Sequence, residues 1–253
     1  MCIRDSLYTE RDPQRIKTLQ ALLQQEQKSP NGLLIADFLL STPGLSLNCK
    51  FFGALTYTVN LNLYKTTQEK INIIQVLNRL LIHLSTSISE LRYDGVQNLF
   101  IIKKLFSNLS LIFNSYKLQD VEWINPLKPL IFMLISNQPP SIDQLNIEVN
   151  LMQLVELSYK DKTPIRLVLE FSSVLVEDLL KIGKDAEKGI IHEYIHSNVY
   201  EITKHLTVFT FESHDDDLIL LGLEYLSSWI LYISFAHNNT AVRYKDLNNL
   251  LQY

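Results

Sequence analysis

The sequence is poor in the residues that form tight turns: its 253 residues include only 7 Gly and 8 Pro. Sheet-rich folds and nucleotide-binding α/β folds need such residues in their many turns and loops. Two cysteines, Cys2 and Cys49, are too few for a disulfide framework and indicate a reducing compartment. These shortages favour an all-helical protein, and the chain is long enough to bury a sizeable core.

An excess of basic charge is also lacking. The sequence carries 27 acidic and 23 basic residues, a formal net charge of −4 at pH 7. Surfaces that bind nucleic acid are normally basic, so direct nucleic-acid binding is not expected and protein partners are favoured.

One long apolar stretch, residues 218–236, approaches the length of a membrane span. Glu224 lies in its middle with Ser227 and Ser228 beside it, which disfavours a lipid environment. Asp215, Asp216 and Asp217 precede the stretch, where a helix dipole favours negative charge. We predict a helix that packs inside the protein, with no membrane insertion.

The two ends of the sequence support different expectations. The start is charged and lacks the apolar core of a secretory signal, and residues 1–11 are expected to be disordered or a non-native leader. Residues 246–253 begin an amphipathic pattern without a cap, which predicts that the helical array continues beyond them.

The rest of the sequence consists of amphipathic segments separated by short breaks. Asp12 is predicted to cap a first helix, with Pro13 at its first position. Further helices are predicted over residues 30–40, 47–64, 68–87, 94–113, 123–135, 142–159, 164–182, 188–209 and 217–236. Residues 207–211 alternate as a strand would, and we interpret them as the end of a helix.

The predicted helices form pairs that recur about every 40 residues, the period of HEAT and armadillo repeats. One pair cannot cover its own apolar face, so successive pairs stack. The sequence therefore predicts an all-α fold, a HEAT/armadillo-type helical-repeat superhelix or solenoid. Residues 12–90 would form its first two repeats and residues 91–253 further repeats. Such stacks present extended surfaces to proteins, and neither an enzymatic activity nor a cofactor is expected.

Two segments resemble a known family. Residues 48–62, NCKFFGALTYTVNLN, are similar to the signature helix of the importin-β N-terminal domain, and SPNGLLIADFLL precedes them as in that family. Residues 222–232, GLEYLSSWILY, resemble a helix of the transportin-SR and importin-thirteen branch and its fungal relatives. The chain is interpreted as the N-terminal region of a karyopherin-β nuclear transport receptor. The resemblance assigns packing roles to Phe51, Phe52, Gly53, Ala54, Leu55 and Trp229.

The resemblance also implies partners. The second helix of each pair would bind the small GTPase Ran in its GTP state, and protein cargo and Phe-Gly-repeat nucleoporins would bind elsewhere. The protein would occupy the cytoplasm, the nucleus and the pores of the nuclear envelope. The residues expected to contact Ran are Asp37, the one charge on the second helix, and the polar stripe Gln68, Asn72, Gln75 and Arg79 on the fourth.

Two alternatives remain. One is a generic HEAT or armadillo scaffold protein in another pathway. The other, more remote, is a zinc metallopeptidase, because His192-Glu193-Tyr194-Ile195-His196 satisfies H-E-x-x-H, which on a helix places two histidines on one face with Glu193 as general base. Val199 and Ile202 stand where the longer motif has Gly and a third His. A helix surface with two histidines is favoured, and no metal is expected.

Overall fold

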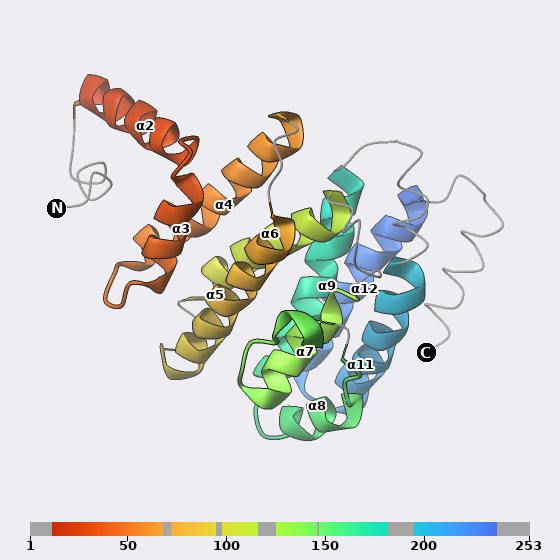
Figure 1. The fold of residues 1–253 in the computed structure, drawn as a ribbon. Helices are drawn as coiled ribbons and strands as arrows, with labels where there is room; N and C mark the ends of the chain where they lie inside the picture. The colour runs from red at the N-terminus through yellow and green to blue at the C-terminus, as the bar shows by residue number, and fades with distance from the viewer. Residues whose placement is uncertain are drawn as a thin grey trace. The chain divides into compact units, whose positions relative to one another are not determined.

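The computed structural model describes residues 12–67, 72–94, 98–115, 125–145, 147–181 and 195–236. Within these ranges all regular structure is helical, with ten α-helices and no strand (Figure 1). The helices pack against one another, so the prediction of an all-α fold is confirmed for this part of the chain. The chain divides into two compact units, residues 1–116 and 117–253.

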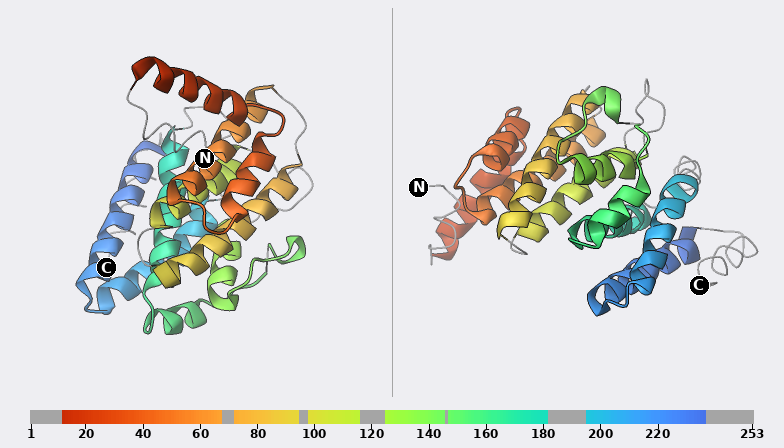
Figure 2. Two further views of the ribbon diagram at one scale, coloured as in Figure 1. Left: turned by 90° about the vertical axis from the view of Figure 1, so that its left-hand side faces the viewer. Right: turned by 90° about the horizontal axis from the view of Figure 1, so that it is seen from below.

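Unit 1 contains five described helices, which are α2 (Pro13–Gln27), α3 (Gly32–Ser41), α4 (Leu47–Thr67), α5 (Ile73–Asp94) and α6 (Leu99–Ser115). The start of α2 is as predicted, because the Asp12 side chain accepts a hydrogen bond from the backbone N–H of Gln14 and Pro13 is the first helical residue. Helix α4 packs against α3 and α6, and α5 packs against α6 and α3 (Figures 1 and 2). Helices α3 and α5 are therefore neighbours on one side of this unit.

Helices α3 and α4 approach each other closely at Gly53. A Cβ atom on Gly53 would lie 3.1 Å from the carbonyl oxygen of Ala36 and 3.1 Å from the Cβ of Leu39. Ala36 and the neighbouring Ala54 are fully buried. Small residues at this crossing are what allow the two backbones to come so near.

Several polar groups inside unit 1 are satisfied between helices. Asn108 of α6 is fully buried, and its amide donates to the carbonyl oxygen of Ala54 at 2.8 Å. Its side-chain oxygen accepts from the hydroxyl of Thr58 at 2.6 Å. At the other end of α4, the nearly buried Lys50 forms an ion pair with Glu90 of α5. These bonds fix the positions of α5 and α6 relative to α4, because a buried polar group that loses its partner is costly.

Unit 2 contains α7 (Leu127–Ser136), a 3-10 turn (Ile142–Gln144), α8 (Leu151–Ser158), α9 (Thr163–Lys181), a π-helical turn (His196–Tyr200), α11 (Glu201–Glu212) and α12 (Asp216–Ala236). Helix α9 packs against α7, α8, α11 and α12, and ten of its residues are buried. It is the central helix of this unit (Figure 1). Residues 207–211 lie at the end of α11, which confirms that they are helical.

Aromatic side chains fill the space between α12 and the turn before α11. The ring of Trp229, fully buried, lies 5.2 Å from that of Tyr200, 5.9 Å from that of Tyr225 and 5.4 Å from that of Tyr232. The hydroxyl of Tyr225 forms a hydrogen bond with that of Thr203. Burial raises the pKa of Tyr225 well above its ordinary value, so this side chain stays neutral in the core.

Helix α12 carries the long apolar stretch. Residues Asp216–Ser234 are the one helix in the described ranges that is long and apolar enough to span a membrane. The side of α12 that packs within unit 2 buries Tyr225, Trp229 and Ile233. The expected packing inside the protein thus holds for one face of the helix, while Leu220, Leu223 and Leu231 on the other face are exposed.

Several predicted helix boundaries are wrong, among them the start of α7, which was expected at residue 123 and lies at Leu127. Residues 142–159 do not form one helix, because Ser141 and Gln144 close a 3-10 turn through a capping box and α8 begins only after Asn150, whose side chain caps it. Helix α5 was predicted to end at residue 87 and extends to Asp94, so the next helix begins at Leu99 and not at residue 94. The predictions for residues 1–11, 68–71, 95–97, 123–124, 146, 182, 188–194 and 246–253 lie outside the described residues.

Candidate functional site

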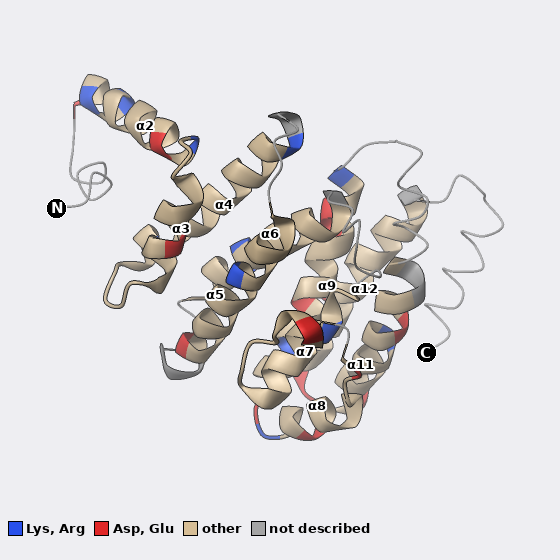
Figure 3. Ribbon diagram, viewed as in Figure 1, with Lys and Arg blue, Asp and Glu red and all other residues tan. Residues whose placement is uncertain are grey.

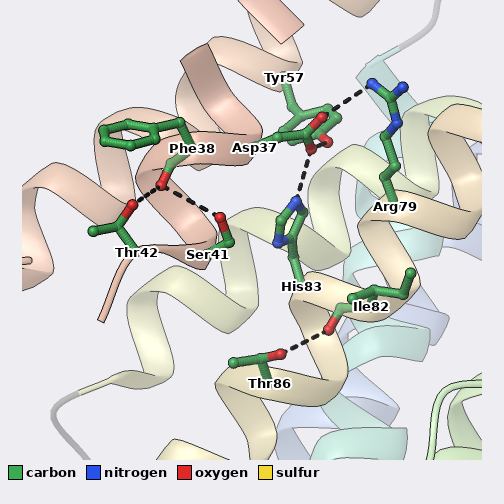
Figure 4. Close-up of polar contacts among 9 residues, drawn as sticks. All are labelled: Asp37, Phe38, Ser41, Thr42, Tyr57, Arg79, Ile82, His83 and Thr86. Atoms are coloured by element: carbon green, nitrogen blue, oxygen red, sulfur yellow. Dashed lines mark hydrogen bonds and ion pairs between the residues drawn. The ribbon is translucent and has the colours of Figure 1, made fainter. Parts of the chain in front are cut away.

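A single carboxylate joins three helices of unit 1. Asp37 is the only charged residue of α3. Tyr57 of α4 donates its hydroxyl to the Oδ1 of Asp37, and the Nε2 of His83 on α5 lies 2.8 Å from the same oxygen. The Nη1 of Arg79 on α5 donates to Oδ2 at 3.0 Å (Figure 4). We call these four residues the Asp37 cluster.

The cluster favours an ionised carboxylate. Burial alone raises the pKa of Asp37, but hydrogen bonds from His83 and Tyr57, with electrostatic attraction to His83 and Arg79, hold it below its usual 3.8. Burial, the hydrogen bond to Asp37 and the negative charge of Asp37 raise the pKa of Tyr57 far above its ordinary value. At neutral pH Tyr57 is therefore a neutral donor and Asp37 is a charged acceptor.

Exposure increases across the cluster from Tyr57 to Arg79. Tyr57 is 0% exposed, and the side chains of His83, Asp37 and Arg79 are 8%, 23% and 41% exposed. Both oxygens of Asp37 already accept hydrogen bonds from the protein. Arg79 is thus the member of the cluster that reaches the solvent.

Large apolar side chains are exposed on both α3 and α5. Leu34 and Phe38 lie one turn apart on α3, and Ile82 lies three residues after Arg79 on α5. Figure 4 shows Phe38 and Ile82 on the two helices that Asp37 connects. We define the α3–α5 face by Leu34, Phe38, Gln75, Arg79, Ile82 and Thr86. Isolated exposed hydrophobic residues are common, but several on adjacent helices with polar residues beside them are typical of an interaction surface.

Charge is sparse on this part of unit 1 (Figure 3). Asp37 is the only charged residue in α3, and Lys50 and Lys65 are the only ones in α4. In the ion pair of Asp37 and Arg79 the guanidinium is the more exposed member, so it is the charged group that the α3–α5 face presents to solvent.

The predicted Ran-contact residues have different surroundings. Asp37 and Arg79 form an ion pair with each other. Asn72 and Gln75 are exposed at the start of α5, where the side chain of Asn72 accepts a hydrogen bond from the backbone N–H of Gln75 at 3.1 Å. Gln68 lies outside the described residues.

Sequence reasoning missed two members of the cluster, Tyr57 and His83. A lone carboxylate on an apolar helix signals that partners are needed, since an unpaired, partly buried charge is unfavourable. The signal does not identify those partners, which are 20 and 46 residues away in the sequence.

The residues with predicted packing roles occupy these positions: Gly53, Ala54 and Trp229 are buried, and Phe51, Phe52 and Leu55 are partly exposed. The ring of Phe51 packs against that of Phe100 on α6, with 5.4 Å between centroids.

The residues of the H-E-x-x-H motif cannot be placed, because His192, Glu193 and the side chain of His196 lie outside the described residues. Among the residues that are described, no group of three or more His, Cys, Asp or Glu side chains is arranged to hold a metal ion.

Comparison with known proteins adds no relative. No protein-family model matches the sequence, and no curated protein matches it.

Proposed function

We propose that the chain is the N-terminal HEAT-repeat region of a karyopherin-β nuclear transport receptor, and that its α3–α5 face binds Ran-GTP. The observation that carries this proposal is the position of α3 and α5, the predicted second helices of two successive pairs. They are neighbours, joined by Asp37, and both expose apolar and polar side chains.

The packing of unit 1 supports the repeat interpretation. In a stack of helical pairs, first helices contact first helices and second helices contact second helices. Helices α4 and α6, the predicted first helices of two pairs, are in contact, and so are α3 and α5. These contacts between like helices are the ones that a HEAT-type stack would give, although α3 packs most extensively against α4 and α5 against α6, not α4 against its predicted partner α5.

The segment that resembles the importin-β signature lies within α4 and connects to the proposed binding face. Gly53 allows α3 to approach α4, and Tyr57 holds the carboxylate of Asp37. In this proposal the signature positions α3 as well as filling the core.

The composition of the α3–α5 face supports a protein partner. Protein interfaces combine an apolar centre with a polar rim and are enriched in aromatic residues and Arg. Phe38 and Arg79 belong to these types, and Gln75 and Thr86 provide polar groups nearby. Protein cargo and Phe-Gly-repeat nucleoporins would bind elsewhere on the receptor as it moves between cytoplasm and nucleus.

The test is binding of the chain to Ran loaded with a non-hydrolysable GTP analogue, compared with Ran-GDP, by biolayer interferometry. We expect the GTP form to bind at least about tenfold more tightly, a difference of about 1.4 kcal/mol. Circular dichroism would establish that the chain is folded. Equal affinities, or no binding by the folded chain, would refute the proposal and favour a scaffold protein in another pathway.

A further inference from the structure

The guanidinium of Arg79 is bonded to Asp37 on one side and exposed to solvent on the other. A guanidinium group has five N–H donors, and Nη1 donates to Asp37. With 41% of its side chain exposed, Arg79 directs part of this group to solvent. The exposed edge can donate to a second acceptor without breaking the contact with Asp37.

The Asp37 carboxylate, which binds Arg79, has two further partners in unit 1. Its other oxygen accepts from Tyr57 of α4 and from His83 of α5, both of which are buried. An arginine side chain has high rotamer entropy, and part of that entropy is lost when the side chain is ordered. Because Asp37 already orders the Arg79 side chain in the free protein, less side-chain entropy is lost when a partner binds.

The charge of the face determines which chemical group complements it. Between residues 73 and 89 of α5, Arg79 is the only Lys, Arg, Asp or Glu. Glu90, the next charged residue, is paired with Lys50. The ion pair of Asp37 and Arg79 carries no net charge, but its more exposed member is the guanidinium, whose planar geometry best matches a carboxylate. Ile82, which is exposed and lies three residues after Arg79 on α5, favours an apolar side chain next to that carboxylate.

We infer that Asp37 is a positioning residue of the docking surface: it holds the guanidinium of Arg79 in place, and Arg79 binds a carboxylate that lies beside an apolar side chain on the partner. This inference rests on the proposed function, because it takes the α3–α5 face as the place where Ran-GTP docks.

A double-mutant cycle with Ran carrying the GTP analogue tests the inference. Arg79→Ala should weaken binding about tenfold, in the range of a charge-assisted hydrogen bond, and Arg79→Lys should not restore it because an ammonium lacks the planar fork. Asp37→Asn should weaken binding severalfold in the wild-type background and have no effect when Arg79 is already Ala. Lys160→Ala, which removes an exposed positive charge in unit 2, is the control and should leave the affinity unchanged.

Equal losses from Asp37→Asn in both backgrounds would show a purely structural role and overturn the inference, as would an Arg79→Ala variant that binds normally. Tyr57→Phe supplies a second, nearly isosteric variant that removes one of the bonds to Asp37. Tyr57→Phe should cause part of the loss of affinity that Asp37→Asn causes.

A measurement on the free chain separates the positioning role of Asp37 from the proposed binding of Ran-GTP. We expect ¹⁵N relaxation of the Arg79 Nε–H group to show a restricted side chain in the wild type and a mobile one in Asp37→Asn. An unchanged mobility refutes positioning, whatever Ran does. A wild-type chain that restricts Arg79 but does not bind Ran-GTP refutes the proposed function, and the docking half of this inference with it.

Discussion

Replacing Gly222 with Ala tests how closely α11 and α12 pack. A Cβ atom at this position would lie 2.3 Å from the Oγ1 of Thr210 and 3.3 Å from the ring of Phe211. Thr210 is fully buried, and its hydroxyl donates to the carbonyl oxygen of Thr207 at 2.7 Å. The new methyl group therefore meets a side chain that is already constrained.

Two opposing effects determine the size of the change. Ala in place of Gly stabilises a helix interior by about 1 kcal/mol. Forcing an extra carbon into a packed core costs about 1–3 kcal/mol, and a separation of 2.3 Å requires the helices to shift apart or Thr210 to lose its hydrogen bond. At so short a separation the cost lies in the upper part of that range, about 2–3 kcal/mol. After the gain of about 1 kcal/mol from helix propensity, we expect Gly222→Ala to lower the free energy of unfolding by about 1–2 kcal/mol.

Urea unfolding followed by far-UV circular dichroism measures this change. Thr210→Ala removes the obstructing oxygen, so Gly222→Ala/Thr210→Ala should be more stable than the sum of the single changes by about 1 kcal/mol or more. Thr210→Ser keeps the hydroxyl oxygen, so it should not restore the stability that Gly222→Ala loses. Ser227→Ala, on the exposed side of α12, controls for helix propensity. A Gly222→Ala variant as stable as the wild type would refute the close packing of the two helices.

Three further changes test individual contacts. Asn108→Ala should lower the free energy of unfolding by about 1–3 kcal/mol in urea titrations, because the hydroxyl of Thr58 loses its buried acceptor; a neutral effect would contradict this. Because the pKa of Asp37 is lower in the folded than in the unfolded chain, its stabilisation is present above pH 3.8 and is lost as the pH falls further. Unfolding titrations at pH 3 to 6 should therefore show a weaker pH dependence for Asp37→Asn than for the wild type, and identical slopes would refute it. Asp12→Ala should lower the helix content at the start of α2, with a cost of about 0.5–2 kcal/mol, and unchanged amide exchange over residues 16–20 would count against this.

Within unit 2 the sequence predicts two long helices well and one interrupted segment poorly. The predicted ranges 164–182 and 217–236 differ by one residue from α9 and from the start of α12, because apolar residues repeat at helical spacing throughout both segments. The stretch 142–159 has the same overall polarity, but the local bonds of Ser141 and Asn150 interrupt the helix. Such side-chain bonds compete with helical ones, and apolar spacing does not reveal them.

At the end of α5 the sequence predicts a break where the helix in fact continues. Residues 85–89 include four hydroxyl-bearing residues, which suggest a break in the sequence. In the structure the hydroxyls of Thr86 and Ser89 donate to the carbonyl oxygens of Ile82 and Ser85, one turn earlier. The buried Ile88 keeps this part of the helix against the core. Tertiary packing here overrides the local preference of the residues.

The candidate site was only partly predictable. Asp37 is conspicuous as the one charge on an apolar helix, and Arg79 lies on a recognisable polar stripe. Their contact depends on how α3 and α5 pack, and the roles of Tyr57 and His83 depend on the same packing. Apolar spacing within a helix indicates which face is buried, but not which residue of another helix that face will meet.

The central claim is that the α3–α5 face binds Ran-GTP, and one pair of substitutions tests it most directly. Phe38 and Met152 are almost equally exposed, 63% and 65%, but only Phe38 belongs to the face. The affinity of Ran carrying the GTP analogue is measured for Phe38→Ser, Met152→Ser and the wild type. The account predicts that Phe38→Ser weakens binding at least about tenfold, the loss expected of a central aromatic residue in an interface, and that Met152→Ser binds as the wild type does. Equal affinities for the two variants would contradict the claim.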